Sequence, residues 1–406
     1  MSGNFLADSR RDRFAAGETR FAESTAVGRL GQTGRLGVGL ALLLAIGALL
    51  FAPRFWPVLT RLDHWTADWR TAYLAPRPAT QNPQLAVVAI TDETLKAYVS
   101  SPIDRDLLAR LIEAIDKAGA KAIGLDILFL KQTEPEKDER LLAAIRAAKA
   151  QVILGALDER GALLPFQREF QTAFLTKTGR PAGYLNERHE NDDVVRYTAS
   201  SMPGSAYPKS FARLLAEAYG AANATDAGRP IAWLLPPLDG KPALLTIAGE
   251  KLLDPAAAGE VAALKDRVVL IGGVFPFRDR HRVPISVRTG ESMPGVMIHA
   301  TVAAQLIDPR FDVAEITPRS IQVLLGALAL LGLAMGLALW RNLSVAFLGH
   351  GFAVAVLLAA DAVCFSQLRL LLPFTLAVAA WVAGLTAGRL LGALGLSGAI
   401  LGRRSS

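Results

Sequence analysis

The chain contains a single cysteine among its 406 residues. Because Cys364 lies inside a long apolar run, any soluble part of the chain has no disulfide and must be held by an ordinary hydrophobic core. The sequence also lacks histidine pairs at zinc-ligand spacing, a Gly-x-Ser-x-Gly nucleophile motif and a glycine loop of the Walker type. We therefore expect neither enzymatic activity nor a bound cofactor.

Apolar residues make up 51% of the chain and gather at its two ends. One run near the N-terminus and three near the C-terminus reach or approach the roughly 20 residues that span a bilayer. The first run could instead be a cleaved signal peptide, but its leader of about 35 residues is long for one. We predict four transmembrane helices, at 36–58, 320–340, 343–365 and 370–388, with 1–35, 59–319 and 389–406 as the remaining segments.

Basic residues flank the predicted spans. Arginines are frequent before the first span, Arg341 lies between the second and third, and three arginines follow the fourth. The positive-inside rule then predicts that both termini are cytoplasmic and that segment 59–319 lies on the other side of the bilayer. These flanks explain much of the net charge of +7, so we expect a lipid bilayer and no nucleic acid as partner.

Segment 59–319 alternates between strand-like and helix-like patterns. Its apolar runs rich in β-branched residues are typical of strands buried on both faces, and they alternate with stretches of helical spacing. The part from 157 to 264 is rich in proline and glycine and shows one clear helix. The expected strands are 85–90, 121–130, 151–156 and 266–273, and the expected helices are 105–119, 138–148, 210–219 and 295–307. This order predicts an α/β domain with a mainly parallel sheet, in addition to the four membrane helices.

Four stretches of this domain match the pattern of a known family. They are Val-Val-Ala-Ile-Thr-Asp at 87–92, Ala-Gly-Ala-Lys-Ala-Ile-Gly-Leu-Asp-Ile-Leu-Phe at 118–129, Arg-Val-Val-Leu-Ile-Gly at 267–272 and Met-Pro-Gly-Val-Met-Ile-His-Ala at 293–300. Together they resemble the CHASE2 extracytoplasmic sensory domain, over about residues 68–306. The three trailing helices are also typical of such receptors.

The resemblance implies a bacterial sensor of a ligand or of stress in the inner membrane, with segment 59–319 in the periplasm. Such modules are usually joined through the trailing helices to a cyclase, a diguanylate cyclase or a kinase. Here only a short tail follows the last apolar run up to Ser406. We therefore expect a separate membrane or cytoplasmic protein to carry the output. The family supplies no catalytic residues that could be transferred to this chain.

A candidate binding site lies where the parallel strands end. Ligands of open parallel sheets bind outside the carboxyl ends of the strands, where helix N-termini offer free N–H groups. The candidate residues are Asp92, Glu93, Asp126, Gly272 and Gly273 at strand ends, joined by Asp279, Arg280 and His281 of the following loop. The loop, with three arginines, could hold an anionic ligand. Alternatively, Asp92 caps a helix, the glycines turn the chain and the basic loop is solvated.

Two further polar groups outside the membrane invite an interpretation. The run from His189 to Asp193, followed by Arg196, could bind a divalent cation, although a turn built on Asp193 is the better interpretation. His299, in the last expected helix of the domain, is most simply a packed histidine.

Polar and small residues mark the predicted spans. His350 and Asp361 fall on one face of the third span, about 16 Å apart along the helix axis. They indicate a transport pathway, interhelical hydrogen bonds or side chains that extend to the membrane interface. Small-residue ridges let helices approach closely, either within the bundle or across a homo-oligomer. These ridges are Gly332 and Gly336 on the second span and Gly384, Gly388 and Gly392 on the fourth.

Three functions remain open from the sequence. The first is a receptor that relays an envelope signal through its helices to a partner. The second is a structural subunit that uses the same domain to dock an envelope complex. The third is a periplasmic enzyme or a transporter, for which the sequence supplies no catalytic pair.

Overall fold

The computed structural model describes residue 47 and residues 57–97 and 103–394. The chain divides into two compact units. The domain unit consists of residues 61–316 and 358–374, and the helical unit contains residues 317–357 and those from 375 onward. The helix α14 (Leu343–Leu368) contributes residues to both units.

A parallel sheet of six strands forms the centre of the domain unit. Its order is β4-β3-β2-β8-β1-β7, and every pairing is parallel. The strands are β1 (Leu85–Ile90), β2 (Ala122–Asp126), β3 (Gln151–Ala156), β4 (Ala182–Tyr184), β7 (Leu245–Ala248) and β8 (Val268–Gly273). The predicted α/β class with a mainly parallel sheet is therefore confirmed for this unit.

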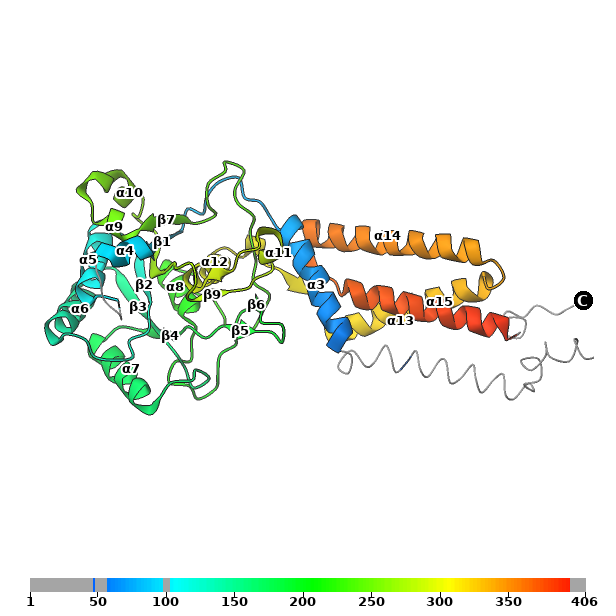
Figure 1. The fold of residues 1–406 in the computed structure, drawn as a ribbon, viewed down its shortest axis with the longest axis horizontal. Helices are drawn as coiled ribbons and strands as arrows, with labels where there is room; N and C mark the ends of the chain where they lie inside the picture. The colour runs from blue at the N-terminus through cyan, green and yellow to red at the C-terminus, as the bar shows by residue number, and fades with distance from the viewer. Residues whose placement is uncertain (1–46, 48–56, 98–102, 395–406) are drawn as a thin grey trace, which may run out of the picture. The chain divides into compact units, whose positions relative to one another are not determined.

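Helices cover both faces of the sheet, as its sequence requires. All six residues of β1 are buried, with Val88 and Ile90 packing on one face and Leu85 and Val87 on the other. The helices α5 (Arg105–Lys117) and α6 (Pro135–Ala147) lie on the first face, and α8 (Phe211–Tyr219) and α12 (Gly295–Ile307) on the second (Figure 1). The core thus consists of two apolar layers separated by the sheet.

The strand register brings the expected site residues to one edge. Asp126 at the end of β2 pairs with Gly272 of β8, and Ile90 at the end of β1 pairs with Gly273. Three neighbouring strands therefore end together, which places Asp126, Gly272 and Gly273 at the carboxyl edge of the sheet.

Several elements differ from the sequence prediction. The second strand ends at Asp126 instead of continuing to 130, and the helix α7 (Pro165–Thr178) was not foreseen. This helix has a clear start, where the Leu164 N–H donates to Gln167 Oε1 (3.0 Å), and a clear stop at Gly179, whose φ is 65°. The sequence does not predict this helix, because the part from 157 to 264 is rich in proline and glycine, which are typical of loops.

The remaining elements of the domain unit are short, apart from one helix. That helix is α3 (Pro57–Leu74), which precedes β1 and begins in the helical unit. The short helices are α4 (Asp92–Ala97), α9 (Gly249–Leu252), α10 (Ala258–Ala262), α11 (Ser286–Thr289) and the 3₁₀ turns η3 (Pro255–Ala257) and η4 (Pro309–Phe311). The short strands pair as β5 (Arg188–His189) with β6 (Val195–Tyr197), β9 (Arg280–His281) with β10 (Met293–Pro294), and β11 (Ala314–Glu315) with β12 (Leu370–Leu371).

Three of the described helices are long and apolar enough to cross a membrane. They are α13 (Pro318–Ala338), α14 and α15 (Phe374–Ala393). They correspond to the three C-terminal spans expected from the sequence. The expected N-terminal span at 36–58 lies largely outside the described residues.

The two glycine ridges face each other within the helical unit. A Cβ atom added at Gly384 of α15 would overlap the backbone of Ala329 on α13, and one added at Gly332 of α13 would overlap Trp381. Gly336 and Gly388 similarly approach the backbone of the opposite helix, and Gly392 packs against Trp340. The ridges therefore serve packing within one chain, which is the first of the two alternatives.

Candidate functional site

A cavity of about 660 Å³ opens at the carboxyl edge of the sheet. Its lining includes four residues expected from the sequence, namely Asp126, Gly273, Asp279 and His281. Other polar lining residues are Asn186, Glu187, His189, Arg278 and His299. The cavity therefore lies where the topology of a parallel sheet favours a ligand site.

Local backbone geometry explains how Asp279 reaches the cavity. Asp279 adopts a left-handed φ of 50°, which aspartate tolerates better than most residues. Its carbonyl accepts a hydrogen bond from the N–H of Gly295, the first residue of α12, at 3.1 Å. A Cβ atom at Gly295 would lie 2.8 Å from Asp279 Oδ2, so a larger residue there would require the Asp279 carboxylate to shift.

Four of the expected site residues do not line the cavity. Asp92 and Glu93 are exposed on α4, and Thr91, not Asp92, caps that helix by accepting a hydrogen bond from the Thr94 N–H at 3.2 Å. The guanidinium of Arg280 donates to the carbonyl oxygens of Phe275 and Ser292 and so fixes the loop. Gly272 lies beneath α12, where an added Cβ would be 2.6 Å from Val296. Arg280 is thus occupied in fixing the loop, whereas Arg278 of the same loop lines the cavity.

Histidine and carboxylate side chains meet at the cavity instead. His281 Nδ1 lies 3.0 Å from Glu187 Oε2, and His281 Nε2 lies 3.2 Å from Asp279 Oδ1. Burial lowers the pKa of His281, but hydrogen bonding to Asp279 and the nearby Glu187 carboxylate outweigh it and raise the pKa to about 10. The same hydrogen bond lowers the pKa of Asp279.

Asp126 brings an unsatisfied carboxylate to the same cavity. Its Oδ2 is shielded from solvent and has no hydrogen-bond partner among the described residues. Burial raises the pKa of Asp126 to about 6, because the charged form is poorly solvated there. The cavity therefore carries three carboxylates, Asp126, Asp279 and Glu187, beside Arg278 and the histidines.

The sequence interpretation missed the role of two cavity residues. Glu187 follows β4 in the stretch that could not be divided into elements, and no spacing linked it to His281. The sequence grouped His189 with the acidic residues after it; of these, Asp193 contacts the Nδ1 atom of His189, while the Nε2 atom lies 3.7 Å from Glu187 Oε2. Asp193 has a φ of 60° and forms the reversal between β5 and β6, so the turn interpretation of this residue is confirmed.

His299 has two roles. Its ring packs edge to face on Phe211, with centroids 5.8 Å apart, as expected of a packed histidine. It also lines the cavity from α12, which the sequence did not indicate.

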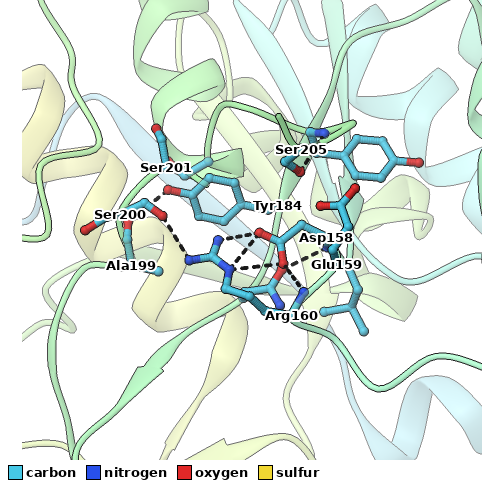
Figure 2. A network of polar contacts seen from close by, with 12 residues as sticks. Asp158, Glu159, Arg160, Tyr184, Ala199, Ser200, Ser201 and Ser205 are labelled. Atoms are coloured by element: carbon cyan, nitrogen blue, oxygen red, sulfur yellow. Dashed lines mark hydrogen bonds and ion pairs between the residues drawn. The ribbon is translucent and has the colours of Figure 1, made fainter. Parts of the chain in front are cut away.

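A polar network stabilises the cavity wall that follows β3. Figure 2 shows the Arg160 guanidinium against the carboxylate of Asp158, and Arg160 Nη1 also donates to the carbonyl of Ser200 at 2.9 Å. The side chain of Asn186 accepts a hydrogen bond from the Asp158 N–H at 3.0 Å. Because Asp158 is fully buried, this network holds the segment containing Asn186 and Glu187 in place.

The hairpin β5–β6 is tied to α3 by a buried ion pair. Arg196 donates through Nε and Nη2 to the two carboxylate oxygens of Asp68, at 2.8 and 2.7 Å. Its Nη1 and Nη2 also donate to Asp192, at 2.8 and 2.7 Å. Asp192 therefore serves Arg196 and does not join His189 in a cation site.

A second ion pair lies two residues further along α3. Arg70 donates to Asp361 of α14 and to the carbonyl of Leu372, and its guanidinium lies 5.3 Å from the Phe365 ring centroid. Arg70 and Asp361 are both buried. The carboxylate of Asp361 in the third expected span is therefore neutralised by Arg70 of α3. Of the alternatives that the sequence left open for Asp361, a hydrogen bond between helices agrees with the structure. His350 is partly buried, and its Nδ1 has no partner among the described residues.

A comparison with known protein families identifies the family of this chain. A profile described as the CHASE2 domain matches residues 41–339, well over half of the chain. Searches of curated proteins and of solved structures found no match. The matched range contains the whole six-stranded sheet and α13, in agreement with the four stretches that resembled the family. The chain belongs to the CHASE2 domain family and combines its sensory module with membrane helices.

Proposed function

We propose that this protein is a multi-pass receptor of the bacterial inner membrane whose periplasmic domain relays an envelope signal to a separate protein. The family and the membrane helices support the sensory part of this proposal. The basic flanks of the spans support the orientation. We include a partner protein that produces the cytoplasmic response, because we expect the chain to signal through its helices.

The observation that carries the proposal is the position of two ion pairs on one helix. Asp68 and Arg70, on the same turn of α3, bind Arg196 of the domain and Asp361 of α14 respectively. The hairpin that contains Arg196 also carries His189 at the cavity. A change at the cavity could thus reach α14 through the hairpin and α3, without a long unpacked segment.

Burial makes these pairs stiff connections. The four side chains are each 5–7% exposed, so little water competes for their hydrogen bonds. Removing one partner of a buried ion pair typically costs about 3–5 kcal/mol, because the other charge is left uncompensated. Movement of the hairpin therefore requires α3 to follow.

A second connection runs through the end of the domain. Tyr197 of β6 donates its hydroxyl to Glu315 Oε1 at 2.6 Å, and Glu315 pairs with Leu371 in the two-stranded β11–β12 sheet. The residues of β12 follow α14 directly in the chain. Two contacts thus lead from the hairpin, one to α3 and one to the strand that follows α14, and both lie within the domain unit.

The test uses the single cysteine as a reporter. Cys364 is partly buried on α14, three residues after Asp361. A nitroxide attached to it in the full chain, reconstituted in lipid nanodiscs, reports packing around α14. We expect Asp126→Asn, which removes the cavity charge that a cationic ligand would neutralise, to change the mobility of the label. We expect Asp68→Asn to abolish that change in the double variant.

Asp106→Asn provides a matched control. Asp106 lies on α5 and forms an exposed ion pair with Arg140, so its loss should leave the spectrum unchanged. Two results would contradict a relay from the cavity through α3 to α14. One is a label mobility that Asp126→Asn does not change, and the other is a change of the same size with and without the Asp68 carboxylate. The alternative of a purely structural docking subunit predicts the first of these results.

A further inference from the structure

We propose that Glu187, His189 and His281 bind a divalent transition-metal ion, with zinc as the best match, at the cavity. The ligand atoms of these three side chains all lie within 4.8 Å of one another. Glu187 and His189 lie two residues apart, in the segment after β4 and in β5, and the fold brings His281 of the distant strand β9 to them.

The separations fit a tetrahedral ion. Zinc binds imidazole nitrogen and carboxylate oxygen at about 2.0–2.2 Å, which places neighbouring ligand atoms roughly 3.3 Å apart in a tetrahedron. Glu187 Oε2 lies 3.0 Å from His281 Nδ1 and 3.7 Å from His189 Nε2. An ion can therefore enter with small side-chain adjustments.

Each histidine is already oriented by a carboxylate on its other nitrogen. His189 Nδ1 lies 2.8 Å from Asp193 Oδ1, and His281 Nε2 lies 3.2 Å from Asp279 Oδ1. Metal-binding histidines almost always donate their second N–H to such a partner, which fixes the tautomer that offers a lone pair to the ion. Here the arrangement occurs twice, and in both cases the remaining nitrogen faces Glu187.

Glu187 supplies an independent observation. Its side chain is 8% exposed, yet neither carboxylate oxygen has a hydrogen-bond partner among the described residues. A buried carboxylate without a hydrogen bond is costly, and a bound cation would relieve that cost. An ion pair between Glu187 and protonated His281 explains the position of these two side chains. It does not explain why Asp193 orients His189 toward Glu187.

The ligand types select the class of ion. Two imidazoles and one carboxylate suit zinc and its neighbours, whereas magnesium and calcium prefer oxygen ligands alone. Three protein ligands leave a fourth position for water or for a small ligand inside the cavity. The binding of the ion is argued from the site alone. A role of the ion as the signal would in addition rest on the proposed function.

Direct binding tests the site. The full chain in nanodiscs, stripped with a chelator, is titrated with Zn²⁺ by calorimetry and with Co²⁺ by visible absorption. We expect one ion per chain, the intense absorption of tetrahedral Co²⁺, and affinity at least 100-fold weaker after His189→Ala or His281→Ala. His350→Ala, on α14, is the matched control and should bind like the wild type.

Asp193→Asn keeps the test valid if the histidine variants unfold. Asparagine tolerates the left-handed backbone of this exposed turn, so the fold should persist while affinity falls by roughly tenfold. Stoichiometric binding that survives His281→Ala unchanged, or no binding by the stripped wild type, overturns the metal site. Neither result affects the Cys364 test of the relay, which uses no metal.

Discussion

Asp126 is a carboxylate buried at the end of a strand, and burial changes its titration. Its carboxylate ends a buried strand, and burial raises its pKa to about 6 from an unperturbed value of 3.8. Protonation therefore favours the folded state. This contribution is fully present below pH 3.8 and is lost as the pH rises through 6.

We predict that Asp126→Asn stabilises the domain at neutral pH. In chelator-treated protein the substitution should raise the free energy of unfolding by about 2–3 kcal/mol at pH 7.5, since one pKa unit corresponds to about 1.4 kcal/mol. Below pH 4 the variant and the wild type should agree. Urea unfolding at both pH values measures the difference, and a variant less stable at pH 7.5 would show that Asp126 has an unrecognised partner.

The site could be predicted in part at this scale. The sequence indicated Asp126 and Gly273 at the ends of strands, and Asp279 and His281 in the loop after β8. It could do so because parallel strands end at one edge of the sheet, where ligands bind. Glu187 and His189 could not be found in this way. They reach the cavity only through the pairing of β3 with β4, and β4 is too short to give a periodic signal.

At the scale of elements, long and strongly patterned segments were predictable and short ones were not. The strand β1 and the helices α5 and α12 agree closely with their sequence patterns. The edge strands β4 and β7 have three and four residues, and their burial depends on neighbours remote in sequence. The helix α7 was not predicted for a different reason, since it lies in the part of the chain that is rich in proline and glycine.

The contact between α13 and α15 yields a prediction about packing. Leucine in place of Gly384 would push against the Ala329 backbone, which cannot rotate away as a side chain would. We expect Gly384→Leu to lower the thermal unfolding midpoint of the detergent-solubilised protein by several degrees. Circular dichroism at 222 nm follows the transition.

Gly326 offers a control on the same pair of helices. An added Cβ at Gly326 of α13 meets no atom within 4 Å, so Gly326→Leu gains helix propensity without a clash. Its midpoint should equal or exceed that of the wild type. Equal losses in the two variants would argue against close packing between the ridges.

At the scale of the whole molecule, the cavity and the part of α14 from residue 358 onward belong to one chain of contacts within the domain unit. The cavity residue His189 lies on the hairpin that carries Arg196, and Arg196 holds the α3 turn whose Arg70 binds Asp361. No local sequence pattern could have joined residues 68, 70, 196 and 361, because the connection exists only in the fold. The membrane carboxylate alone left a transport path and interhelical hydrogen bonds as alternatives, and its partner Arg70 favours the second.

The most direct measurement follows zinc binding and the nitroxide on Cys364 in the same titration. In the wild type, the account predicts that the label changes over the concentration range in which zinc binds. In Asp68→Asn, zinc should bind with similar affinity while the label stays unchanged. Zinc binding that leaves the wild-type label unmoved, or an undiminished response in Asp68→Asn, would contradict a relay from the cavity through α3 to α14.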